Sequence, residues 1–153
     1  ALGEQAFYGC SELTAVTIPK GLTAINKNTF YNCAKLASIT IYSGITTIGE
    51  GAFKNCSSLT TLDVTNFDTR NVTDMSDMFS NTGYKSKAFT LKLGDKFDTS
   101  NVTNMADMFY ATGYSSSTFL LDCSNWNVDK VIWHEHFNSR VETKVIKPTA
   151  WAN

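Results

Sequence analysis

Short stretches that alternate apolar and polar residues recur along the chain. An apolar residue, a polar residue and a second apolar residue or cysteine give the period of two that is typical of a strand with one face turned inward. The stretches are Val16-Thr17-Ile18, Ile39-Thr40-Ile41, Leu62-Asp63-Val64, Leu91-Lys92-Leu93 and Leu121-Asp122-Cys123. Their first residues stand 23 to 30 positions apart. That spacing is too long for a hairpin, so neighbouring strands are predicted to be parallel.

The strands belong to two sets of internal repeats. Three units with a period of 23 begin at Ala1, Ala24 and Thr47 and occupy residues 1–65. Two units with a period of 30 occupy residues 66–124, in which NFDTRNVTDMSDMF aligns with KFDTSNVTNMADMF. A degraded copy and a C-terminal cap, with a final strand around Val145–Ile146, are expected in residues 125–153. No unit buries its apolar face alone, so we predict that all of them stack into a single solenoid domain, 1–153.

The pattern changes between the strands. Val72, Met75 and Phe79 lie at i, i+3 and i+7, which predicts one to two turns of helix with an apolar face. Ile48 and Phe53 belong to a similar pattern in the shorter units. The predicted fold class is therefore α/β: a right-handed solenoid of about six turns, with parallel short strands on one face and short helices on the other.

These units resemble the BspA-type leucine-rich repeats of bacterial cell-surface proteins. IGEGAFKNCSSLTTLDV is similar to the shorter form of that repeat, and FDTSNVTNMADMF to the longer form. The resemblance covers nearly the whole chain. It implies a leucine-rich-repeat-like solenoid at the cell surface or secreted, with adhesion or protein binding as its role and no catalytic residues. The chain departs from the pattern in its last copy, where His134 stands in the position of Met75.

Composition and charge exclude several function classes. Thirteen Lys and Arg against 14 Asp and Glu give a net charge of -1, which removes the electrostatic argument for a nucleic-acid partner. The chain has no apolar run of about 18 residues, so we expect no membrane insertion by this segment. Because Ala1 falls within a repeat unit and no signal peptide is visible, we expect upstream repeats to precede it.

Cysteine and histidine are the residues most often used for metal binding or redox chemistry. Cys10, Cys33 and Cys56 share one repeat position, and Cys123 falls on an inward strand position. This placement favours buried free thiols, with a disulfide or a metal as the weaker alternatives, because zinc sites use closely paired ligands such as C-x2-C.

His134 and His136 flank Glu135, but this is not the H-E-x-x-H spacing that places two rings on one helix face. We assign the degraded copy no metal site. The acidic residues lack the spacing of a calcium loop, and the chain has no nucleophile elbow or phosphate-binding loop. The sequence therefore predicts no enzyme activity and no cofactor.

One surface remains as the candidate site. The outward residues of the strands are expected to align as a polar stripe with one neighbouring aromatic residue. The candidate binding stripe consists of Thr17, Thr40, Tyr42, Asp63, Lys92 and Asp122. Repeat proteins use extended stripes of this kind to bind partners. We expect a non-enzymatic binding or adhesion module for an extracellular protein or glycan. The alternative is a structural spacer, a stalk that presents another domain at the cell surface.

Overall fold

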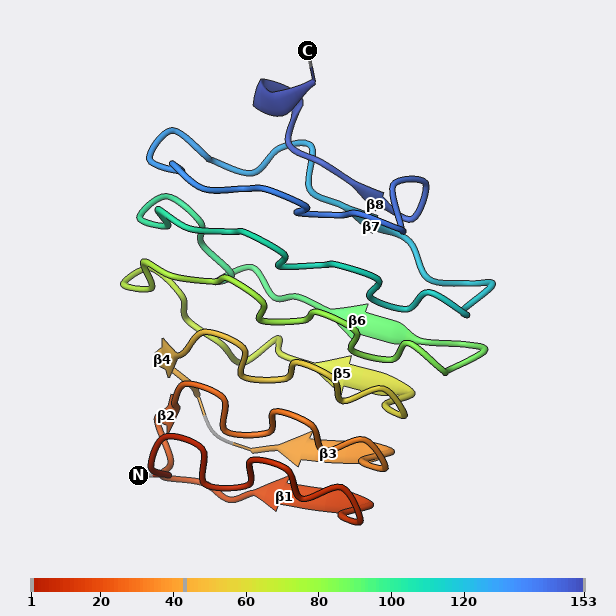
Figure 1. Ribbon diagram of the computed structural model, residues 1–153. Coiled ribbons are helices and arrows are strands. Elements are labelled where there is room, and N and C mark those ends of the chain that lie inside the picture. Colours follow the sequence, from red (N-terminus) through yellow and green to blue (C-terminus); the bar gives the residue numbers. More distant parts are fainter. Residues whose placement is uncertain (1, 43, 153) are drawn as a thin grey trace.

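The chain winds into a stack of flat coils that runs from the N-terminus to the C-terminus (Figure 1). The computed structural model describes residues 2–42 and 44–152. Its elements are β1 (Ala15–Ile18), β2 (Ala24–Ile25), β3 (Ser38–Ile41), β4 (Thr47–Ile48), β5 (Thr61–Asp63), β6 (Thr90–Lys92), β7 (Leu121–Asp122), β8 (Val145–Ile146) and the 3-10 helix η1 (Thr149–Trp151).

The strands pair in parallel, each with the strand one coil away. β1 pairs with β3, β2 with β4, β5 with β6, and β7 with β8. Val16 lies opposite Ile39, and Leu62 lies opposite Leu91, so each inward position meets the same position of the next unit. This register confirms the predicted parallel strands, and the predicted β8 also forms. The right-handed coil and the unit boundaries at residues 65 and 124 remain predictions.

The helices predicted between the strands do not form, so the helical half of the α/β class is not borne out. Across residues 2–42 and 44–152 the only helix is η1. The segment around Met75 and Phe79 is a run of turns, in which Asp77 and Asn81 have positive φ angles of 57° and 54°. Residues in this left-handed conformation change the chain direction and prevent a helical ladder.

The backbone hydrogen bonds show why the turns are favoured here. The amide of Met78 closes a turn on the carbonyl of Met75 at 3.3 Å, whereas the amide of Phe79 leaves the coil and donates to Met108 at 3.0 Å. Alternate amides thus hold the coil and its neighbour together, while the apolar side chains still point inward. The spacing i, i+3, i+7 predicts a helix, but turns of this kind place the same three residues inward, so the spacing does not distinguish the two structures.

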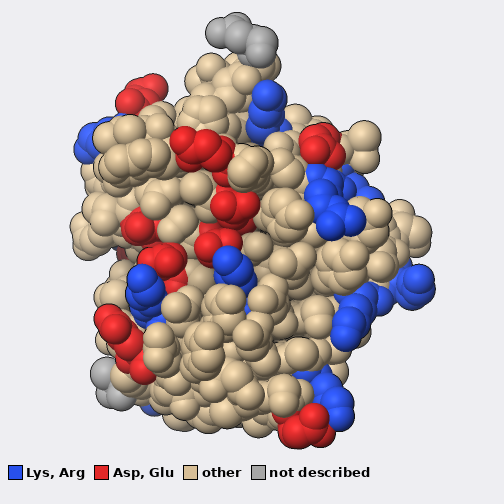
Figure 2. All heavy atoms as spheres, viewed as in Figure 1, with Lys and Arg blue, Asp and Glu red and all other residues tan. Residues whose placement is uncertain are grey.

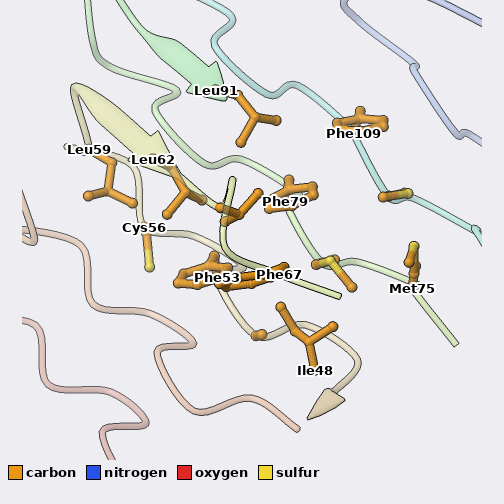
Figure 3. Packing of buried hydrophobic residues seen from close by; sticks show 14 of the residues in the cluster. Ile48, Phe53, Cys56, Leu59, Leu62, Phe67, Met75, Phe79, Leu91 and Phe109 are labelled. Atoms are coloured by element: carbon orange, nitrogen blue, oxygen red, sulfur yellow. The ribbon is translucent and has the colours of Figure 1, made fainter. Parts of the chain in front are cut away.

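The core is a continuous column of apolar side chains between the strands and the turns (Figure 3). The rings of Phe7, Phe30, Phe53, Phe79 and Phe109 stack in succession, with centroid distances of 5.4, 5.8, 6.2 and 5.5 Å and nearly parallel planes. The two sets of repeats therefore share one core although their periods differ.

The last coil ends this column with an aromatic cap. Phe137 is buried and meets Phe109 edge-on at 5.2 Å. The expectation that His134 takes a buried methionine position is wrong, because its side chain is exposed. Instead its ring stacks on Trp151 of η1 at 4.2 Å. Trp151 in turn packs edge-on against Phe137 at 5.1 Å.

Candidate binding surface

The candidate binding stripe lies on the outward positions of the strands, where the alternation of each strand places it. Thr17 lies opposite Thr40, and Asp63 lies opposite Lys92. All four residues are exposed, and Asp122 is exposed opposite Ile146.

The structure brings the stripe residues together in pairs rather than in one unbroken row. Among the strands that the structure describes, β3 and β5 form no strand pair, and one amide of this junction, that of Thr60, donates to Ala37 at 3.4 Å.

Two carboxylates of the stripe are fixed by local hydrogen bonds. Asp63 Oδ1 accepts hydrogen bonds from the hydroxyl of Thr65 at 2.6 Å and from its amide at 3.0 Å. These bonds, with a smaller contribution from Lys92, lower the pKa of Asp63. Asp122 Oδ1 accepts from the amide of Ser124 at 2.8 Å, and the hydrogen bonds from Ser124 lower the pKa of Asp122. Both side chains therefore stay ionised at neutral pH, on either side of Lys92.

Tyr42 lies beyond the end of β3, and its side chain is 60% exposed. It forms part of the wall of a groove of about 400 Å³. The other lining residues are Gly44, Thr65, Asn66, Asp95 and Lys96. They come from loops of successive coils, so the strand pattern gave no signal for them.

Gly94 lets two of these loops approach closely. A Cβ atom at Gly94 would collide with the backbone of Thr65, including its carbonyl oxygen. A contact to backbone cannot be relieved by rotating a side chain. The glycine is therefore needed for close packing, as at other points where two backbones meet.

Two apolar side chains add to the same surface near the C-terminus. Leu120 and Ile146 are 65% and 44% exposed. Leu120 directly precedes β7, and Ile146 lies opposite Asp122 in β8. The outward position of Ile146 in its strand was the available signal, whereas the sequence pattern predicts that strand only as a cap. These residues give the surface apolar anchors besides Tyr42.

The four cysteines are free thiols. Cys33, Cys56 and Cys123 are buried as predicted, whereas Cys10 is only partly buried. The thiols of Cys33 and Cys56 donate to the carbonyls of Phe7 at 3.2 Å and Phe30 at 3.1 Å. Burial raises the pKa of Cys33 to about 11 and that of Cys56 well above its usual range. These thiols stay protonated and unreactive at neutral pH.

The two histidines have separate surroundings. His134 stacks on Trp151, while His136 Nδ1 lies 3.6 Å from Asp107 Oδ1. A search of the described residues finds no group of three or more His, Cys, Asp or Glu that could hold a metal ion. Within the same residues, no helix has the length and apolar character needed to cross a membrane.

Comparison with known proteins gives one match. The family model described as BspA type Leucine rich repeat region (6 copies) matches residues 1–100. These residues include the three shorter units and the first of the longer units. No curated protein and no solved structure matches the chain.

Proposed function

Because the chain belongs to the family of BspA type leucine-rich-repeat regions, we propose that it is a non-enzymatic binding or adhesion module displayed at the cell surface or secreted. Its partner is an extracellular protein or glycan. The whole chain, 1–153, acts as one solenoid domain in this proposal, and the candidate binding stripe is the contact surface.

The observation that carries the proposal is the register of the outward strand residues. Thr40 repeats the position of Thr17, and Lys92 repeats that of Asp63. A partner that lies across the coils would therefore contact one outward side chain from each paired strand, held at a regular spacing by the strand backbone. Tyr42, Leu120 and Ile146 supply exposed apolar contacts at the margin of this polar row. Apolar and aromatic anchors surrounded by polar residues are typical of protein interfaces.

The charge distribution supports a contact that depends little on salt. The net charge is -1, and Figure 2 shows acidic and basic side chains together on the face drawn there. Binding that is driven by phosphates falls steeply as salt increases, whereas binding at a balanced surface does not. This favours a protein or neutral glycan partner over a nucleic acid.

A binding assay with added negative charge on either side of the solenoid tests the proposal. The double variant Thr40→Glu, Lys92→Glu adds negative charge to the stripe. The control Lys54→Glu removes positive charge from the turn side, where Lys54 Nζ lies 2.9 Å from Asp77. We expect adhesion to extracellular-matrix proteins or host cells to be lost only in the stripe variant, with both variants folded by circular dichroism.

Two outcomes would contradict the proposal. Loss of adhesion in the control alone would move the contact to the turn side. A folded wild-type protein that adheres to none of these surfaces would favour the spacer alternative, in which the stack holds another domain away from the cell.

A further inference from the structure

The first coil ends the stack with backbone carbonyls that have no donor. Within the stack, the amide of Phe7 donates to the carbonyl of Thr29, in the second coil, at 2.9 Å. Ala6 is the residue of the first coil that corresponds to Thr29. Its carbonyl and that of Glu4, two residues earlier, accept no hydrogen bond from the part of the chain that the structure describes. We call this the acceptor end of the stack.

The last coil ends the stack with amides that have no acceptor. The amides of Asp107 and Phe109 donate to the last coil at 2.9 and 2.8 Å. His136 and Asn138 are the corresponding residues of that coil, and His136 repeats the positive φ of Asp107, 55°. Neither amide has an acceptor among the described residues, whereas the next amide of the row, that of Arg140, is bound by a carboxylate. This donor end and the acceptor end lie at opposite ends of the stack (Figure 1).

The acceptor end also leaves the apolar core uncovered. Four apolar side chains of the first coil are only partly buried: Leu2, Phe7, Leu13 and Val16. The corresponding side chains of the second coil are at most 9% exposed: Ile25, Phe30, Leu36 and Ile39. Ala6 is exposed, although the residues at its position in the next two coils, Thr29 and Ala52, are fully buried. The first coil therefore has the side chains of a coil that lies between two others.

The donor end carries two large apolar side chains. Ile132 and Trp133 are 65% and 51% exposed, so η1 does not cover them. They lie beside Thr103 and Asn104 of the preceding coil, which are polar. The change from polar to apolar residues thus occurs at the end of the stack. An exposed tryptophan with an aliphatic neighbour is a suitable anchor for a protein contact.

A second copy of this chain fits both ends. In the register that joins coils within the stack, Glu4 and Ala6 of the second copy bring their carbonyls to the amides of His136 and Asn138. Because β1 follows the turns of the first coil as β8 follows those of the last, the same placement brings β1 of the second copy beside β8. Each strand has an open edge, since among the described strands β1 pairs only with β3 and β8 only with β7. Open strand edges pair readily with other strands.

Contact between two like ends is disfavoured, because carbonyls would face carbonyls or amides would face amides. We propose that a second copy of this chain stacks its first coil on the last coil, head to tail. The pair keeps one free acceptor end and one free donor end, so further copies add in the same way and form a filament. The contact uses the backbone edges of the strands rather than the outward side chains of the stripe. The inference does not depend on the proposed function.

Sedimentation equilibrium of the chain tests the proposal. We expect the mean mass of the wild type to rise with protein concentration and to pass that of two chains. Ala6→Arg should fold, because Ala6 is exposed, but should weaken association at least about tenfold, because stacking buries the added charge. Ala15→Arg is the matched control. Ala15 lies opposite Ser38 and both are exposed, so a coil above or below leaves this position in solvent, and the variant should associate as the wild type does.

Mixing the proteins tests the head-to-tail arrangement itself. Ala6→Arg keeps its donor end, so adding it to the wild type should end the growing stacks and lower their mean mass. Circular dichroism checks that both variants are folded. The proposal is overturned if the wild type stays a single chain at millimolar concentration, or if its mass stops at two chains. It is also overturned if Ala6→Arg and Ala15→Arg weaken association equally, or if folded Ala6→Arg fails to shorten the wild-type stacks.

Discussion

The ring of Phe53 lies 6.2 Å from that of Phe79 and is tilted by only 5° relative to it, although the two residues belong to units of different length. Both side chains are fully buried. The ring spacing at the junction between the two kinds of repeat is the longest in the phenylalanine stack, but the column continues through it with nearly parallel rings. The strands of these two coils, β5 and β6, also pair in parallel, so backbone hydrogen bonds and the aromatic column together hold the junction.

Phe53→Ala should lower the free energy of unfolding by about 3–5 kcal/mol, because it opens a cavity in the middle of the column. Thr40→Lys, on the exposed side of β3, should change it by no more than about 0.5 kcal/mol. Urea denaturation measures both. Equal shifts of the two midpoints would show that the inward and outward positions are misassigned.

Because the thiol of Cys33 is buried, we expect the free energy of unfolding to fall at alkaline pH. Burial raises the pKa of its thiol from 9.0 to about 11, so the unfolded chain loses this proton before the folded chain does. Between pH 9 and 11 the unfolded state binds fewer protons, and the free energy of unfolding must therefore fall as pH rises through this window. Denaturation midpoints measured across it would reveal the slope.

Cys33→Thr is the matched control for this effect. Thr82 and Thr112 occupy the corresponding place in later coils, and their hydroxyls donate to the carbonyls of Phe53 and Phe79 at 2.9 and 2.7 Å. The variant should fold, and its free energy of unfolding should fall less steeply as pH rises.

A thiol titration of the wild type should find about four thiols after denaturation and few before. Two or fewer would mean that a disulfide exists.

Gly94→Ala should destabilise the fold by about 1–3 kcal/mol, since its new methyl group would collide with the backbone of Thr65. Gly44→Ala is the neighbouring control, because the nearest atom to its Cβ is Asn66 O at 3.8 Å, an ordinary contact. Thermal unfolding of both variants compares them. If Gly94→Ala is as stable as Gly44→Ala, the two loops do not approach as closely as the structure shows.

The pKa of Asp63 should depend on Thr65. Thr65→Val removes the shorter of the two hydrogen bonds to the carboxylate, so the pKa of Asp63 should rise toward its ordinary value. Asp122, which is held by Ser124 instead, should titrate as in the wild type. Carboxyl carbon shifts followed by nuclear magnetic resonance report both groups. An unchanged pKa of Asp63 would mean that the backbone amide of residue 65, together with Lys92, is enough to lower it.

The sequence predicted the strands of the alternating stretches, because alternation with a fixed repeat determines both the inward face and the partner, but it did not predict the two-residue strands β2 and β4. It could not separate helices from turns around Met75, where both place the same residues inward. The left-handed positions held the missing signal, because Asn32, Asn55 and Asn81 recur where a helix interior disfavours asparagine. Cys56 and Thr82, each three residues after a column phenylalanine, could also have joined the two repeat sets.

Only the part of the candidate surface that lies on the strands could be predicted from the sequence. Thr17, Thr40, Asp63 and Lys92 follow from strand alternation, and the structure places them where that pattern requires. The groove beside Tyr42 does not follow from it, since Gly44, Asn66 and Asp95 lie in loops whose meeting depends on how the coils stack. Loop contacts between units of different length have no period that a sequence pattern could reveal.

The turn amides beside the phenylalanine column also give one row of the stack an electrical direction. Those of Gln5, Phe30, Phe53, Phe79 and Phe109 all donate toward the following coil. Their peptide dipoles add along this row and leave partial positive charge at its outer end on the last coil, whereas other amides, such as those of Gly49 and Gly83, donate to the preceding coil. A carboxylate sits there: Glu142 Oε1 accepts a hydrogen bond from the amide of Arg140 at 3.0 Å. It serves the solenoid as an acidic N-cap serves a helix.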